Sequence, residues 1–181
     1  MRWAALWRAV NVGKRTVASA ELRRFLADQG LTDGRTLLAS GNAVFASEEE
    51  EPSLLEARLD AAFKHRFGFA AEVLLRDAAA LDRVIAANPF GEAARDRPNR
   101  LLVTFYRVAP TPAQVEELAR LSAAGEPLAL AADALFVDHG QGVATSRLPQ
   151  LMTKLRFPPV ATARNWNTVC KLRAALAEAG A

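Results

Sequence analysis

The order of apolar periods in the first 76 residues is the feature that most constrains the fold. Strand-like runs cover residues 2–10, 34–39, 43–47 and 69–76, and helical periods cover residues 19–30 and 52–67. Ser40, Gly41 and Asn42 separate the second and third strands, as in a hairpin. This β-α-β-β-α-β order predicts a ferredoxin-like unit.

The same order recurs in the second half of the chain. After a helix at residues 78–87 and a linker at 88–99, the sequence predicts strands at 100–108, 126–132, 134–139 and 158–163, with helices at 112–121 and 146–155. A last helix begins near Asn165. We expect an α+β protein of two fused ferredoxin-like (βαββαβ) halves with an added C-terminal helix: residues 1–76, a helix and linker at 77–99, and residues 100–181.

Composition excludes several classes of protein. The single cysteine cannot form an internal disulfide, and with two histidines it leaves too few ligands for a structural zinc site. The apolar run from Trp3 to Trp7 is too short to span a membrane, and we expect a cytoplasmic protein with no metal and no cofactor. A net charge of +3 favours an anionic partner, although the basic residues are scattered.

Polar and basic residues fall in two loops that this fold places at one end of the first sheet. One explanation is turn chemistry alone, because asparagine and glycine tolerate left-handed backbone conformations. The other is an anion pocket made of exposed amides and cations. The candidate ligand-binding residues in these loops are Arg8, Asn11, Gly13, Lys14, Ser40, Gly41 and Asn42.

A second candidate region lies where the loop 139–147 approaches the end of the last predicted strand. Asn165 is a candidate helix cap, and Trp166 is expected to bury its ring. Arg164, Asn165 and Asn167 are candidate ligand-binding residues. We expect Arg164 and Asn167 to face the loops of the first half across a cleft. Within the 139–147 loop, Ser146 is a candidate cap and Arg147 an anion contact, and His139 is expected to be a solvated loop residue.

Several segments together resemble a known family. They are "ALWRAVNVGKRTV", "ELRRFLADQGLTDGRTLLASGNAVF", "NPF" and "TARNWNTVCKL", of which "SGN" and "RNWNT" are the most specific. The chain resembles domain of unknown function 1697, a set of small, mostly bacterial proteins. The resemblance implies an α+β fold and no established activity. The usual loop of the family reads Arg-Gly-Ile-Asn-Val-Gly-Gly, and here Ala9 and Lys14 replace the first and last glycine.

Three functions remain open from the sequence. The first is a binding module for an anionic ligand, either a phosphorylated small molecule or nucleic acid; exposed aromatic residues that would stack on bases are few, with Phe105 and Tyr106 the candidates. The second is an enzyme with a site between the halves, for which no general base or nucleophile is evident. The third is a homo-oligomeric interaction protein that pairs with another copy through alanine-rich helices or an exposed strand edge.

Overall fold

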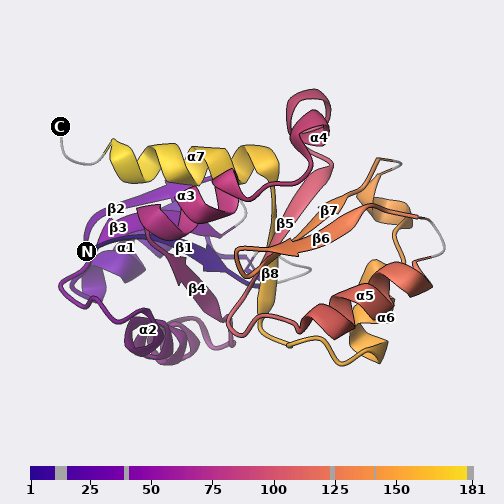
Figure 1. The fold of residues 1–181 in the computed structure, drawn as a ribbon. Coiled ribbons are helices and arrows are strands. Elements are labelled where there is room, and N and C mark those ends of the chain that lie inside the picture. Colours follow the sequence, from indigo (N-terminus) through magenta and orange to yellow (C-terminus); the bar gives the residue numbers. More distant parts are fainter. Residues whose placement is uncertain (11–15, 39–40, 123–124, 141, 179–181) are drawn as a thin grey trace. The chain divides into compact units, whose positions relative to one another are not determined.

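A computed structural model describes residues 1–10, 16–38, 41–122, 125–140 and 142–178 of the chain (Figure 1). The chain groups into two compact units, Met1–Asp82 with Lys171–Ala181, and Arg83–Cys170. The predicted boundaries at residues 76 and 100 stay a prediction, because compactness alone does not show which segment folds independently. None of the helices in the described part of the chain has the length and apolar character needed to cross a membrane.

The first unit contains a four-stranded antiparallel sheet with strand order β2-β3-β1-β4. Its elements follow the predicted β-α-β-β-α-β order: β1 Arg2–Trp7, α1 Ser19–Asp28, β2 Thr32–Leu37, β3 Asn42–Ala46, α2 Pro52–Phe67 and β4 Val73–Arg76. The ferredoxin-like prediction for this half is confirmed.

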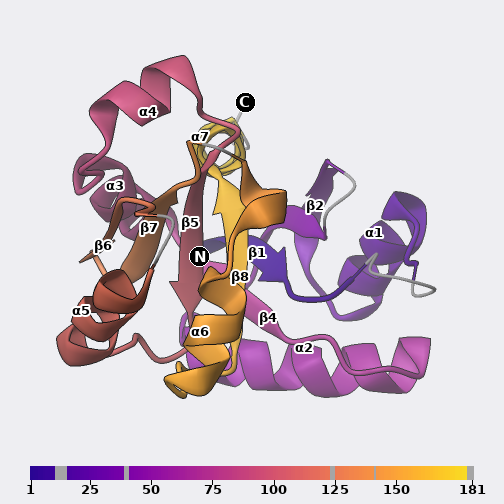
Figure 2. The same cartoon turned by 90° about the vertical axis from the view of Figure 1, so that its right-hand side faces the viewer.

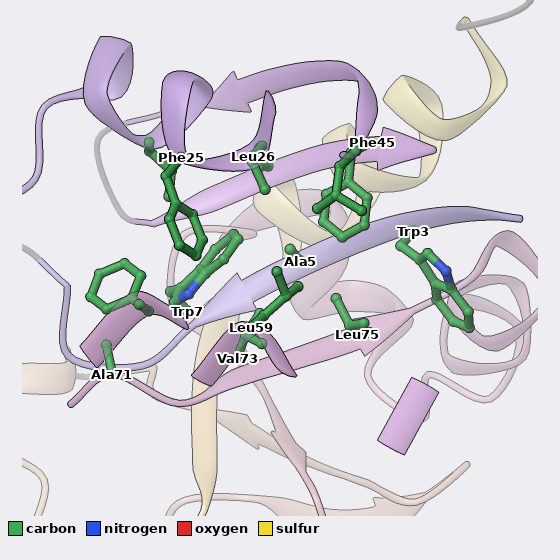
Figure 3. Close-up of a cluster of buried hydrophobic side chains, with 14 of the residues drawn as sticks. Trp3, Ala5, Trp7, Phe25, Leu26, Phe45, Leu59, Ala71, Val73 and Leu75 are labelled. Carbon is green, nitrogen blue, oxygen red and sulfur yellow. The ribbon is translucent and has the colours of Figure 1, made fainter. Parts of the chain in front are cut away.

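Alternation along β1 builds the core of the first unit. Trp3, Ala5 and Trp7 point to the face that α1 and α2 cover, as Figure 3 shows. From α2, Phe63 packs its ring 5.6 Å from that of Phe25 and 4.5 Å from that of Phe67, measured between ring centroids. This cluster fixes both helices on the sheet.

The helix ends of the first unit follow local chemistry. Pro52 opens α2, and the Glu51 side chain accepts a hydrogen bond from the backbone N–H of Ser53. Gly68 ends the helix in the left-handed conformation, at φ 75°. In α1, Ser19 is the first helical residue, and Ala18 before it is the cap residue, without a side-chain bond.

The second unit repeats the topology. Its sheet has strand order β6-β7-β5-β8, again antiparallel throughout, and Figure 2 shows α5 and α6 side by side. This confirms the second ferredoxin-like half. The elements are β5 Leu101–Tyr106, α5 Pro112–Leu121, β6 Leu128–Ala131, β7 Ala134–Asp138, a 3-10 turn at Val143–Thr145, α6 Leu148–Lys154 and β8 Ala161–Asn165.

Three further helices complete the chain: α3 Ala78–Ala86, α4 Gly91–Asp96 and the C-terminal helix α7 Trp166–Ala177. The helix α4 lies inside the segment 88–99, where the sequence predicted a linker and no helix. Its end is fixed by Arg97, whose guanidinium donates to both carboxylate oxygens of Asp138, with Nη2 2.7 Å from Oδ2. Asp138 raises the pKa of Arg97 through this hydrogen bond.

Candidate functional site

One end of the second sheet gathers segments that are distant in the sequence. Strand pairing places the start of β5 beside Asp138 of β7 and Asn165 of β8. The backbone of residues 98–100 lies between these two strand ends: His139 donates its N–H to the carbonyl of Arg100, and Trp166 donates its N–H to that of Pro98. The loop that starts at His139 and the start of "RNWNT" therefore lie at the same end of the sheet, as predicted, with residues 98–100 between them.

The "RNWNT" segment is first a helix start. Asn165 Oδ1 accepts hydrogen bonds from the N–H and the hydroxyl of Thr168, at 2.9 and 2.8 Å, which confirms the predicted cap of α7. Asn167 Nδ2 donates to Asn99 Oδ1 at 2.9 Å. Trp166 is partly buried, which agrees in part with the prediction of a buried ring. Asn99 was missed because the segment around it carries no apolar period.

Arg164 is buried, which its position in a polar motif did not indicate. It shares the buried face of β8 with Thr162 and donates to the hydroxyl of that residue at 2.6 Å and to the carbonyl of Ala163 at 2.8 Å. Burial lowers the pKa of Arg164 to about 10. Its contact with a ligand, like that of Asn165 and Asn167, stays a prediction.

The first candidate site lies partly outside the described residues, which exclude Asn11, Gly13, Lys14 and Ser40. Trp7 donates its N–H to the carbonyl of Gly41 at 2.9 Å, so the end of β1 and the β2–β3 turn do share one end of the sheet, as predicted. Asn42 is fully buried at the start of β3, and Arg8 forms a salt bridge of 3.3 Å with Glu72. The predicted anion pocket there stays a prediction.

Two residues of this edge adopt the left-handed conformation. Gly41 has φ 69°, and a Cβ atom on it would lie 3.2 Å from the Cβ of Trp7 and 3.3 Å from that of Val10. Ala9 has φ 57°. A glycine is the natural residue for such a position, in agreement with the glycine usual in the family loop.

Ala9→Gly is expected to raise the free energy of unfolding by roughly 0.5 to 1 kcal/mol. Relief of about 1 to 2 kcal/mol of left-handed strain outweighs the extra freedom that glycine gains in the unfolded chain. Urea denaturation measures the change. The matched control is Ala27→Gly, an exposed position inside α1, where the same substitution should lower stability by about 1 kcal/mol. A loss of stability in both variants would contradict this explanation of Ala9.

His139 and Glu126 form a buried pair beside this sheet end. The imidazole Nδ1 lies 2.7 Å from Glu126 Oε1, and the side chains are 6% and 10% exposed. The prediction of a solvated histidine is wrong. The β6–β7 ladder explains why: it pairs Leu128 with Val137, and the ladder continues outward as Asp138 donates its N–H to the carbonyl of Pro127.

A cavity of about 490 Å³ lies between the C-terminal end of α5 and the helix α6. Leucine side chains supply its apolar wall, and Glu126, Arg147 and Lys154 supply charged groups; the leucines are Leu121, Leu148 and Leu151. The pKa of Glu117 is lowered mainly by its hydrogen bond with Arg120 and also by the charge of Lys154. Of the residues considered in the sequence, only Arg147 lines this cavity.

Two βαββαβ units in one chain define a double ferredoxin-like α+β protein, a class by fold and not by activity. The chain belongs to the family described as protein of unknown function (DUF1697), which matches residues 1–136. The "RNWNT" segment lies beyond that match.

A solved structure supports the same fold. The conserved bacterial protein SP0830 from Streptococcus pneumoniae is similar over 97% of this chain and 98% of its own, with a TM-score of 0.76 and 23% identity. This likeness concerns the fold alone. Among curated proteins, none matches the chain.

Proposed function

We propose that the protein binds a small organic anion in the cavity between α5 and α6. The observation that carries this proposal is the presence of Arg147 and Lys154 on the wall of a cavity whose other lining residues include three leucines beside polar groups. A guanidinium and an ammonium group together hold a phosphate or carboxylate, and apolar walls bury the body of a small molecule. The third charged group, Glu126, is engaged by His139.

A phosphorylated or carboxylated small molecule fits this site better than nucleic acid does. Single-stranded bases are commonly held by stacking on exposed aromatic rings of a sheet. Phe105 and Tyr106, the aromatic candidates on β5, are 1% and 3% exposed, which leaves neither ring free to stack. A cytoplasmic location is part of the proposal. The interdomain site, the enzymatic alternative and the oligomeric alternative stay predictions.

Isothermal titration calorimetry with phenyl phosphate and para-methylbenzoate tests the proposal. Both probes combine an anionic head with an apolar ring. Arg147→Gln combined with Lys154→Gln should weaken binding by about ten-fold or more, because the loss of two charge-assisted contacts exceeds about 1.4 kcal/mol. Raising the salt concentration should weaken binding to the unaltered protein as well.

The control for this titration removes the same charge elsewhere. Arg95 and Lys171 are exposed and do not line the cavity. Arg95→Gln combined with Lys171→Gln should therefore change the Kd by no more than about two-fold, because salt screens distant surface charges. Equal weakening in both double variants would show non-specific attraction. The absence of saturable binding for both probes would contradict the proposal.

A further inference from the structure

We infer that the ligand of the α5–α6 cavity is dipolar: it carries an amino group that Glu126 binds, in addition to the anionic group that Arg147 and Lys154 bind. This inference rests on the proposed function and specifies the chemical class of the ligand. Two observations carry it. Glu126, a shielded carboxylate, lines the same cavity as Arg147 and Lys154, and among the described residues it forms no ion pair with either cation.

The carboxylate of Glu126 is held in place and retains capacity for further bonds. Its side chain is 10% exposed, and Oε1 contacts Nδ1 of His139 at 2.7 Å. A carboxylate accepts about four hydrogen bonds, and shielding it from water is unfavourable unless donors surround it. A ligand amine would supply up to three such donors to this acceptor group.

His139 acts as a positioning residue for this acceptor. Its ring is 6% exposed, and its backbone is fixed on both sides: its N–H donates to the carbonyl of Arg100, and its carbonyl accepts from the N–H of Gly142. A ring held in this way restricts the Glu126 side chain to few rotamers. The entropy of ordering that side chain is then lost on folding and not on ligand binding.

The cationic and the anionic residues of the cavity come from different parts of the chain. Glu126 precedes β6, whereas Arg147 directly precedes α6 and Lys154 ends that helix. The leucines of α5 and α6 lie on the same wall and suit an apolar spacer. The ligand class is therefore an amino acid-like molecule with an apolar body between an amine and an acid. Molecules with two acids or two amines would meet a group of like charge, which is unfavourable.

The experiment compares matched probes by isothermal titration calorimetry on the full chain. Para-methylbenzoate carries the acid and the ring, whereas para-(aminomethyl)benzoate and para-(aminoethyl)benzoate add an amine at two distances. At least one amine probe should bind about ten-fold or more tightly than para-methylbenzoate, as expected for one charge-assisted contact in a shielded site. Glu126→Gln should abolish this preference, because the neutral amide still accepts from His139 but no longer pairs with an ammonium group.

The outcomes separate this inference from the proposed function. If para-methylbenzoate binds in the cavity and neither amine probe binds more tightly, the inference is overturned and the anion site stands. If the preference survives in Glu126→Gln, Glu126 is not the acceptor and the inference is overturned. If no probe binds, the proposed function fails, and the inference fails with it. Circular dichroism of Glu126→Gln confirms that the variant is folded.

Discussion

Phe63→Ala is expected to lower the free energy of unfolding by about 3 to 5 kcal/mol, the range for removing a buried aromatic side chain. Phe63 is fully buried and is the centre of the aromatic cluster: its ring contacts those of Trp7, Phe25, Phe67 and Phe69. Alanine would leave a cavity between α2 and the first sheet. A loss of this size is a large part of the stability of a typical domain.

Urea denaturation followed by circular dichroism measures this loss. Leu54→Ala is the control on the same helix, because Leu54 is 61% exposed and its truncation should change stability by less than about 0.5 kcal/mol. If Phe63→Ala lowered the free energy of unfolding as little as Leu54→Ala, Phe63 would not pack between α2 and this sheet as described.

The second large effect concerns the buried His139–Glu126 pair. Glu126→Ala is expected to lower the free energy of unfolding by about 1 to 3 kcal/mol, because it leaves a buried imidazole nitrogen without the contact it makes at 2.7 Å. His139→Ala should have an effect of similar size. The double variant should lose less than the two single variants combined, by a coupling energy of about 0.5 to 3 kcal/mol.

A double-mutant cycle by thermal and urea denaturation gives this coupling. Glu116 is an exposed carboxylate on α5, and Glu116→Ala combined with His139→Ala should show additive effects. Additive effects in the Glu126 cycle as well would show that the pair does not interact in solution. Glu126 would then not be held in place as an acceptor on the cavity wall.

The apolar periodicity of the sequence predicted the fold because most helices and strands show their own spacing of apolar residues. The helices at Pro52–Phe67 and Pro112–Leu121 were predicted to the residue: each starts with a proline, and the first ends before a glycine. Strand order followed from topology, since few arrangements of a β-α-β-β-α-β chain are compact. The helix at Gly91–Asp96 escaped prediction because six residues show too little periodicity.

The sites were harder to predict because side-chain partners depend on register. The predicted strands 126–132 and 134–139 leave Asp133 between them, and in the structure Ala132 and Asp133 both turn with left-handed φ angles, of 46° and 59°. A two-residue turn at that point sets residue 126 opposite residue 139, so the buried pair could have been found by extending the ladder. Arg164 offered no comparable signal, because alternation along β8 does not reveal which face is buried.

The most direct test of the account is a chemical-shift titration of the isotopically labelled protein with para-methylbenzoate. An anion bound between α5 and α6 should produce saturable shifts in the backbone amides of Leu121, Thr145 and Leu148, which line the cavity, and leave those of Gly41 and Asn42 unmoved. Saturable shifts at Gly41 and Asn42 with none along the cavity would place the anion site at the first sheet edge and contradict the account.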